Sequence, residues 1–375
     1  MLKLPGNLTA ATFLERHWQK QALFIPGACQ RLRPSISRNE LGWLATLADV
    51  ESRLVFVARD EAVTRYRAET GPFATEYLQN LPKRDWTLLV YDVEKHLPAM
   101  RALFRYVPFV PDWRIDDLMV SFAAPGGGVG PHRDKYDVFL CQGTGIRNWR
   151  ISGDPIRNDP RASDDLALLD EFVGDEDYDA AEGDVLYLPP GVAHWGTARR
   201  SCMTYSIGMR APQACDIAPS VGTAEEDPFY RDPDLKLDEI APGYISARAA
   251  ARAAALPGSS CGSQGDAAVA LGRFATRNKD WLKPDAATRP EVDAAIEHLR
   301  SGGRLEVHGM SQIAFDERHL YVNGSSSNLP AHAQAIIEKI CASRRLSAST
   351  LSDIGHRKMV VWMLQQGAFE IPENS

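Results

Sequence analysis

The sequence has few cysteines and no regular arrangement of them. Six cysteines are scattered through 375 residues, and no two of them form a CxxC pair. A disulfide framework needs regularly placed cysteines and an oxidising compartment, so this distribution argues against one. It favours buried or free thiols in a reducing cytoplasm.

Long apolar runs and an excess of positive charge are also missing. The chain shows no N-terminal run of the signal-peptide type and no stretch that is long and apolar enough to span a membrane. Its net charge of −7 argues against wholesale non-specific nucleic-acid binding. Hydrophobic residues make up 44% and charged residues 24%, a normal globular mix. We therefore expect a soluble, cytoplasmic protein of two or three domains, with no membrane partner.

One stretch carries residues that suit a metal. Residues 126–151 are GGGVGPHRDKYDVFLCQGTGIRNWRI and contain His132 and Asp134, two positions apart. A second stretch, GDVLYLPPGVAH, ends at His194 after a Pro-Pro-Gly turn. Two histidines and one carboxylate form the facial triad that leaves three positions open on Fe(II). The H-x-D triplet alone is weak, and its combination with the second stretch is what predicts an iron site.

An arginine follows the first stretch at a position that suits a cosubstrate. A 2-oxo acid such as 2-oxoglutarate would fill two open metal positions, with dioxygen at the third, and its far carboxylate would need a cation. Arg147 follows the Gly-Thr-Gly turn, on the strand after the one that follows H-x-D. A guanidinium suits a carboxylate because both can form two parallel hydrogen bonds. Arg150 has the opposite strand parity, so we expect it to face the other way.

The middle of the chain has the sequence pattern of a β-barrel. Short strands separated by Gly and Pro turns are expected at 118–123, 138–142, 148–151, 185–188 and 203–209, after N-terminal helices and strands. This spacing favours an antiparallel barrel or jelly roll, which can hold a metal in one mouth. Residues Asp164 to Asp184 form an acidic insertion. It is either a solvated loop and helix or a negative rim that attracts a cationic substrate.

The last third of the chain changes to helices. We expect helices at 245–256 and 262–274, too small to stand alone, which should pack on the barrel or on a second copy. From Asp285 onward, helices and a hairpin with an Asn-Gly turn are similar to a winged helix. This part has 9 Lys and Arg against 11 Asp and Glu, a net charge of −2. DNA-binding winged helices are usually basic, so we interpret this one as a protein-contact module.

The two motif stretches resemble the JmjC-type ribosomal oxygenases, and PDWRIDDLMVSFAAPGGGVGPH resembles their bacterial branch. The resemblance implies a mixed α and β chain with a double-stranded β-helix (jelly-roll, cupin-like) JmjC domain at 1–211, a helical dimerisation region at 212–284 and a winged-helix-like domain at 285–375. It implies His132, Asp134 and His194 as Fe(II) ligands and Arg147 as the partner of 2-oxoglutarate. The implied activity is hydroxylation of an arginine in a large-subunit ribosomal protein, by a homodimer that makes no direct nucleic-acid contact.

Several alternatives stay open at this stage. A histidyl hydroxylase or a lysyl demethylase would need the same triad, and a non-enzymatic cupin-type sensor with a DNA-binding winged helix is a different class. The substrate-gripping residues cannot be identified from sequence. Five candidates lie near the motif and are interpreted as structural: Asp116, Asp117, Met119, Ser121 and Tyr136.

Overall fold

A computed structural model describes residues 2–4, 8–29, 32–60, 64–152, 161–163, 168–218, 228–257, 263–352 and 354–372. The chain divides into two compact units. The first comprises Met1–Pro108 and Ile115–Met209, and the second comprises Phe109–Arg114 and Arg210–Ser375. The three-domain division at 211 and 284 stays a prediction. The start of the acidic insertion, with Asp164 and Asp165, and the first residue of the helix expected at 262–274 lie outside the described residues.

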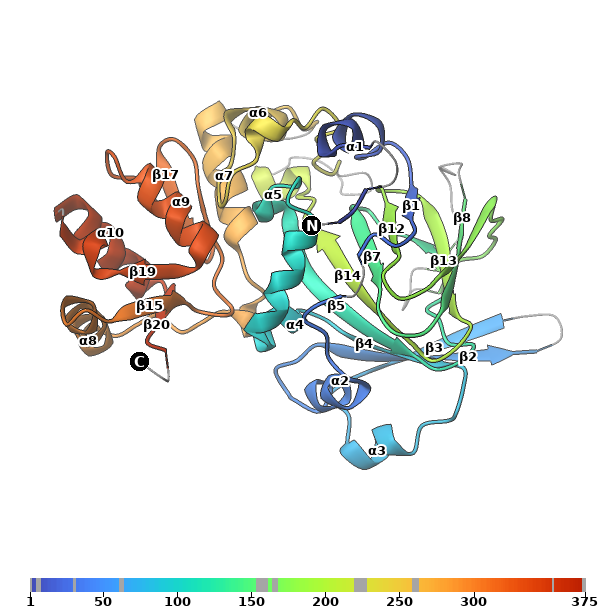
Figure 1. Cartoon of the computed structure of the whole chain (residues 1–375). Helices are drawn as coiled ribbons and strands as arrows, with labels where there is room; N and C mark the ends of the chain where they lie inside the picture. The colour runs from blue at the N-terminus through green and yellow to red at the C-terminus, as the bar shows by residue number, and fades with distance from the viewer. Residues whose placement is uncertain are drawn as a thin grey trace. The chain divides into compact units, whose positions relative to one another are not determined.

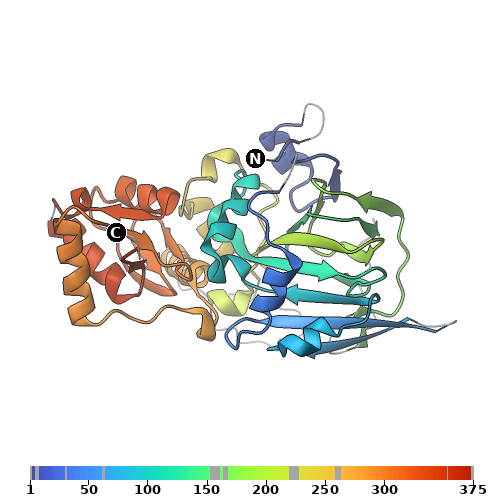
Figure 2. The same ribbon diagram turned by 60° about the horizontal axis from the view of Figure 1, so that its bottom comes forward.

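The first unit contains two antiparallel sheets (Figure 1). The larger has the order β1-β12-β7-β14-β5-β4-β2-β3, and Figure 2 shows β2 and β3 as a long hairpin at its edge. Its strands are β1 Leu23–Ile25, β2 Ser52–Arg59, β3 Thr64–Thr70, β4 Trp86–Val90, β5 Ile115–Ala123, β7 Val138–Gln142, β12 Val185–Leu188 and β14 Cys202–Met209. The smaller, of order β11-β8-β13-β6, consists of β6 His132–Arg133, β8 Arg147–Ile151, β11 Glu176–Ala180 and β13 Ala193–Ala198. A separate pair is formed by β9 Arg161–Ser163 and β10 Leu168–Leu169.

The two sheets enclose a common core. Val138 and Leu140 of the larger sheet cluster with Trp149 and Ile151 of the smaller one. Because side chains alternate along a strand, these residues fix which face of each sheet points inward. The result is the two-layered arrangement expected for a jelly roll.

Short helices precede and follow the strands of this unit, and local capping explains where they begin. The Thr9 hydroxyl accepts a hydrogen bond from the Thr12 amide at the first helix, and Ser37 and Glu40 form a capping box at the second. The helices are α1 Ala10–Arg16, α2 Arg38–Leu44, α3 Thr75–Gln79, α4 Val93–His96 and the 3₁₀ helix η1 Pro98–Tyr106.

The second unit combines helices with two small sheets of orders β19-β15-β20 and β16-β17-β18. Its helices are α5 Ala214–Ile217, α6 Ala247–Ala254, α7 Gln264–Thr276, α8 Arg289–Arg300, α9 Gln334–Ser343 and α10 Ile354–Gln365, with 3₁₀ turns η2 Asp112–Arg114, η4 Leu237–Glu239, η5 Asp280–Leu282 and η6 Ala348–Ser352. Its strands are β15 Arg304–Val307, β16 Ile313–Phe315, β17 His319–Val322, β18 Ser325–Asn328, β19 Arg345–Ser347 and β20 Phe369–Glu370. Within the described ranges, no helix combines the length and the apolar character that crossing a membrane requires.

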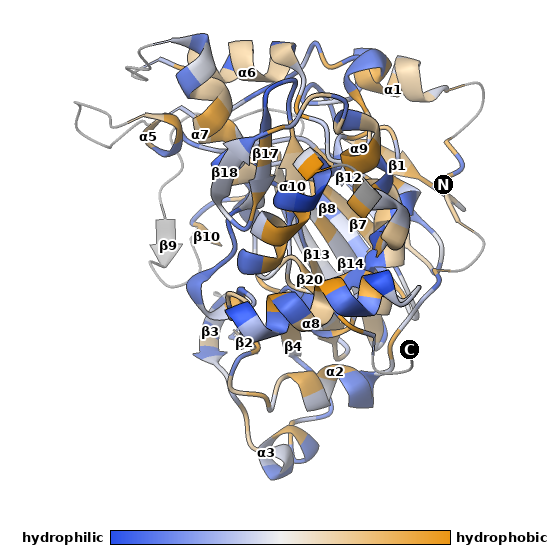
Figure 3. Cartoon of the chain, turned by 90° about the vertical axis from the view of Figure 1, so that its left-hand side faces the viewer, coloured by the Kyte–Doolittle hydropathy of each residue, from blue (hydrophilic) through white to orange (hydrophobic). Residues whose placement is uncertain are grey.

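Helices α6 and α7 do not form a free-standing pair. Ala249 of α6 and Leu271 of α7 share a core cluster with Ala314 and Tyr321 of the β16-β17-β18 sheet. The sequence predicts that these helices pack on the barrel or on a second copy, and the sheet of their own unit supplies apolar surface for them. A second cluster lies between α8, α9, α10 and β15, and Figure 3 shows α8 alternating between hydrophobic and hydrophilic residues as its one-sided burial requires.

Two secondary-structure predictions were wrong. Residues 176–180 of the acidic insertion form strand β11, because pairing with β8 satisfies their backbone whatever their side chains. Residues 346–351 belong to the stretch after Asp285 where, apart from the hairpin, we expect helices, yet they form the end of strand β19 and most of η6, since Arg345 and Leu346 pair with β15. Strands β3 and β13 were not predicted, because they contain too many polar or small residues to show the pattern of a strand in the sequence. The Asn323-Gly324 hairpin was confirmed, with both residues at positive φ.

Gly196 tests the packing between β13 and β8. A Cβ at this position would lie 2.4 Å from the Trp149 ring. Gly196→Ala should therefore lower the free energy of unfolding by roughly 1–3 kcal/mol, measured by urea titration. Gly42→Ala in α2 is the matched control. Its Cβ would meet only Leu78, at 3.9 Å, and helix propensity should raise stability by about 0.5–1 kcal/mol. Equal effects of the two changes would contradict this account of the packing.

Candidate metal and cosubstrate site

Three side chains that can ligate a metal meet at one end of the smaller sheet. His132 of β6 lies directly opposite His194 of β13, and Asp134 follows β6. Directly opposed residues of antiparallel strands point to the same face. Their ring centroids are 4.2 Å apart. The sequence motif and the strand register therefore bring the three predicted residues together.

The distances suit a single ion. Asp134 Oδ1 lies 3.9 Å from His132 Nε2, and Asp134 Oδ2 lies 3.6 Å from His194 Nε2. All three ligand atoms lie within 4.8 Å of one another. Two atoms that each bind an ion at about 2.1 Å are at most about 4.2 Å apart, which both carboxylate-imidazole distances satisfy.

The surroundings hold the histidines in a ligating form. Nδ1 of His132 lies 3.0 Å from the Gly130 carbonyl oxygen, and Nδ1 of His194 lies 3.1 Å from that of Val192. A proton on Nδ1 that is donated to a carbonyl leaves the lone pair on Nε2, the atom that faces Asp134. Burial, and then the neighbouring His132, lowers the pKa of His194 to about 4. His194 is therefore neutral at physiological pH, as a metal ligand must be.

Arg147 lies on the same inner face as the histidines. It is paired with Ala198, and Ala198, Gly196 and His194 share one side of β13. Ala198 is four positions after His194, a rise of about 13 Å along the strand. Trp149 is paired with Gly196, midway along the strand between His194 and Ala198. Its ring centroid lies 5.9 Å from that of the His194 ring and 5.4 Å from the Arg147 guanidinium carbon.

The Arg147 guanidinium is only partly satisfied. Its side chain is buried, and its Nε and Nη2 atoms have no hydrogen-bond partner among the described residues. Leaving a buried donor unpaired costs free energy, so such an atom indicates a missing acceptor. A carboxylate oxygen is the acceptor that this geometry fits best.

A second unpaired polar atom lies at the same end of the sandwich. Ser121 is opposite Thr204, which is opposite Gln142, so all three share the inner face of the larger sheet. Gln142 ends β7, and only four residues separate it from Arg147. The Ser121 hydroxyl is buried without a partner. Sequence reasoning assigned Ser121 a structural role, and only the cross-strand register reveals its position.

The opposite end of the sandwich is acidic. Asp117 is paired with Gly208, and Gly208 with Val138, at the start of β7 and close in sequence to Asp134. A Cβ on Gly208 would lie 3.1 Å from Asp117 Oδ1 and 3.9 Å from the Tyr136 ring, so both side chains converge over this glycine. Burial, and then Asp116, Asp92 and Glu94, raise the pKa of Asp117 well above its usual value. A cation placed beside Asp117 would favour its ionised form.

Two acidic residues of the insertion lie on the outer face instead. Asp177 and Asp179 of β11 both accept hydrogen bonds from the Asn148 amide, and Asp179 also accepts one from Arg199. Arg150 is on this outer face too, with its guanidinium carbon 4.2 Å from the centroid of the Trp195 ring. The predicted opposite orientation of Arg147 and Arg150 is confirmed by this register.

The low pKa of His194 makes a prediction for the metal-free protein. The unfolded chain binds a proton at this histidine near pH 6.5, whereas the folded chain does so near pH 4. Stability should therefore fall as the pH falls from 6.5 to 4, by up to about 3 kcal/mol from this residue. Urea titrations with a chelator should show a shallower decline in His194→Gln than in the parent. Identical pH profiles would contradict the assignment.

Comparisons with known proteins agree with this geometry. Residues 102–217 match the JmjC domain family and residues 265–368 match the ROXA-like winged helix. The chain is 40% identical over 230 residues to the ribosomal protein uL16 3-hydroxylase of Escherichia coli, a match that spans 60% of each protein. A probable ribosomal oxygenase of Haemophilus influenzae is 33% identical over 241 residues, 57% of its length.

The similarity to a solved structure extends along the whole chain. The Escherichia coli ribosomal oxygenase YcfD aligns over 99% of both chains with a TM-score of 0.74 and 27% identity, and it is also known in complex with cobalt and 2-oxoglutarate. The predicted mixed α and β fold, with a jelly roll followed by a winged helix, is thereby confirmed. The chain therefore carries a JmjC domain and, beyond it, a ROXA-like winged helix, which confirms its resemblance to the JmjC-type ribosomal oxygenases.

Proposed function

We propose that this protein is an Fe(II)- and 2-oxoglutarate-dependent oxygenase that hydroxylates an arginine side chain of a large-subunit ribosomal protein. The observation that carries the proposal is the placement of a His-Asp-His cluster and a partly unpaired, buried arginine on one inner face of the same sheet. The similarity to a uL16 3-hydroxylase supports the substrate class.

In this proposal His132, Asp134 and His194 hold the metal. The donor set fits iron, since two neutral imidazoles and one carboxylate leave half of an octahedral shell open. Arg147 would hold the far carboxylate of 2-oxoglutarate, and the Ser121 hydroxyl would donate a hydrogen bond to it as well. The carboxylate would give both of these buried, unpaired polar groups the acceptor that they lack.

When bound, iron and 2-oxoglutarate use dioxygen to insert one oxygen atom into a C–H bond, and 2-oxoglutarate leaves as succinate and CO₂. The protein's own residues orient the reactants. The Trp149 ring lies near both His194 and Arg147 and would form one wall of the space between them, excluding water from that side. Gly196 leaves room for that ring. The carbonyl groups of Gly130 and Val192 fix the two imidazoles.

An arginine substrate fits the acidic end of the sandwich. Asp117 faces inward at the end that holds the metal ligands, and a guanidinium beside it would relieve the repulsion from Asp92, Asp116 and Glu94. Tyr136, which converges on the same glycine, could pack against the substrate's planar group. A lysyl demethylase would find the same charge, whereas a neutral histidine would leave Asp117 without a cation. This contrast favours a cationic side chain over the histidyl alternative.

The sensor alternative is less well supported. A cupin-type sensor needs neither a cosubstrate cation nor an inward-facing acid, and a DNA-binding winged helix would usually be basic. We also propose a cytoplasmic homodimer, as the resemblance implies. The described cysteines, Cys29, Cys141, Cys202, Cys215 and Cys341, form no disulfide, which agrees with a reducing compartment. An acidic rim that attracts the basic substrate also stays a prediction.

Incubation of purified uL16 with the protein, Fe(II) and 2-oxoglutarate tests the function directly. Peptide mass spectrometry should find a gain of one oxygen atom on an arginine. The product should be absent when 2-oxoglutarate is omitted or when Asp134→Ala replaces the parent. Oxygen on a histidine instead would select the histidyl hydroxylase, and loss of a methyl group from lysine would select the demethylase.

Removal of Arg147 should act on the cosubstrate. Arg147→Ala should raise the KM for 2-oxoglutarate by a factor that corresponds to about 2–5 kcal/mol, because a buried charge pair is lost. The KM for the protein substrate should change little. Arg150→Ala on the outer face of the same strand is the control, and a larger effect there would reassign the role.

Removal of the inward acid should act on the protein substrate instead. Asp117→Asn should raise the KM for the arginine peptide roughly tenfold or more, since it deletes one partner of a buried ion pair. Its KM for 2-oxoglutarate should stay near that of the parent. Asp116→Asn changes the exposed neighbour on the outer face. If the two variants gave the same peptide KM, Asp117 would not be the contact.

A further inference from the structure

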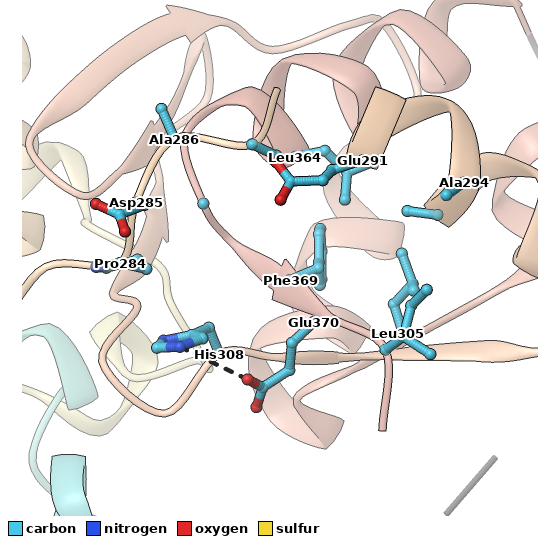
Figure 4. A pocket seen from close by; sticks show the side chains of 14 residues that line it. Pro284, Asp285, Ala286, Glu291, Ala294, Leu305, His308, Leu364, Phe369 and Glu370 are labelled. Atoms are coloured by element: carbon cyan, nitrogen blue, oxygen red, sulfur yellow. Dashed lines mark ion pairs between the residues drawn. The ribbon is translucent and has the colours of Figure 1, made fainter. Parts of the chain in front are cut away.

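A groove of about 450 Å³ lies entirely within the second unit (Figure 4). Glu291 and Ala294 of α8 form one side, and β15 and β20 contribute Leu305 and Phe369. Residues 284–287 pass along the other side. A cavity of this size holds a few side chains rather than a whole domain.

The floor of the groove is apolar. Ala295, Leu305, Leu364 and Phe369 belong to the core cluster of this unit, so their inner sides are fixed by packing. Ile371 lines the groove and is 44% exposed. An apolar side chain placed here would bury existing apolar surface on a preformed base, which favours binding.

The rim carries charge of one sign. Three carboxylates, Asp285, Glu291 and Glu370, are among the 14 lining residues, and no lysine or arginine is. Hydrogen bonds from Thr288 lower the pKa of Glu291, which keeps it ionised. Glu370 Oε2 lies 3.6 Å from His308 Nε2. His308 Nδ1 accepts a hydrogen bond from the Met310 amide, so its proton is on the nitrogen that faces Glu370.

The groove also borders a sheet edge. In the order β19-β15-β20, strand β20 pairs on one side only, among the strands that the structure describes. An extended peptide can pair with such an edge while its alternate side chains enter a pocket. Glu370 is both a residue of this strand and a rim carboxylate.

A second groove in the same unit provides an internal contrast. It lies along α10, and its lining residues include Arg357, Lys358 and Trp362 and no acidic residue. A partner attracted to this second groove would be acidic. Because the two grooves carry opposite charge, charge alone would distinguish the partners that bind to each of them.

We propose that the groove beside α8 is a docking site for a short, extended, basic peptide segment that carries apolar side chains. Its lysine or arginine residues would meet Asp285, Glu291 and Glu370, and an apolar side chain would contact Leu305 and Phe369. None of these residues takes part in the proposed oxygenase site. The docking site can therefore be tested independently of that function.

Fluorescence anisotropy with the full-length protein tests this proposal. The probe is the fluorescein-labelled peptide Arg-Leu-Lys-Val-Arg, and the comparison peptides are Arg-Ser-Lys-Ser-Arg and Glu-Leu-Asp-Val-Glu. The first should bind, the second should bind more weakly because it lacks apolar side chains, and the third should not bind. A labelled single-stranded RNA tests the other class of partner. Binding of the acidic peptide or the RNA in place of the basic peptide would overturn the proposal.

Paired variants locate the bound peptide. The double change Asp285→Asn with Glu370→Gln should raise the Kd roughly fivefold or more, whereas Asp293→Asn, on the exposed side of α8, should not. Ala294→Trp should fill the groove and weaken binding at least about tenfold. Ala335→Trp is its control, because it places the same side chain at an exposed position of α9. If peptide affinity is unchanged in both groove variants, while thermal unfolding shows them folded, the groove is not the docking site.

Discussion

The register between β6, β13 and β8 is the constraint on which the proposed site depends. It places His132 opposite His194 and Ala198 opposite Arg147, so that two imidazoles and a guanidinium share one inner face. A slip of one residue would turn every one of these side chains outward. The hydrophobic pairing of Trp149 and Ile151 with the larger sheet fixes that register, because the same slip would expose both.

This arrangement divides the interior of the first unit into two ends with different electrostatics. Arg147 and Ser121 bring unpaired donors to one end, and Asp117 brings a carboxylate with a raised pKa to the other. Each end is costly by itself, since unpaired buried donors and a partly buried carboxylate crowded by other acids both destabilise a fold. A dicarboxylate at the first end and a cationic side chain at the second would offset both costs, with the metal ligands beside the second. The proposed reaction needs this arrangement, with the cosubstrate reaching from the first end to the metal and the substrate side chain beside the metal at the second end.

Much of this could be predicted from local sequence. His132, Asp134 and His194 stand in motifs whose turns and spacing are visible in the chain, and strand parity was sufficient to orient Arg147 against Arg150. Ser121, Asp117 and Trp149 could not be placed, because their roles depend on which strand of the other sheet lies opposite. Strand β11 was missed because its acidic side chains lie on an edge strand, where solvent and Asn148 satisfy them. Long-range pairing thus overrode the local pattern in each of these cases.

Titration calorimetry of 2-oxoglutarate binding tests the central claim most directly, because it asks whether metal and cosubstrate occupy one site. Mn(II) can replace iron without turnover. The parent should bind 2-oxoglutarate at least roughly tenfold more tightly with Mn(II) than after chelation, and His194→Ala should lose that difference. Equal affinity with and without the metal would contradict a shared site. So would an undiminished metal effect in His194→Ala.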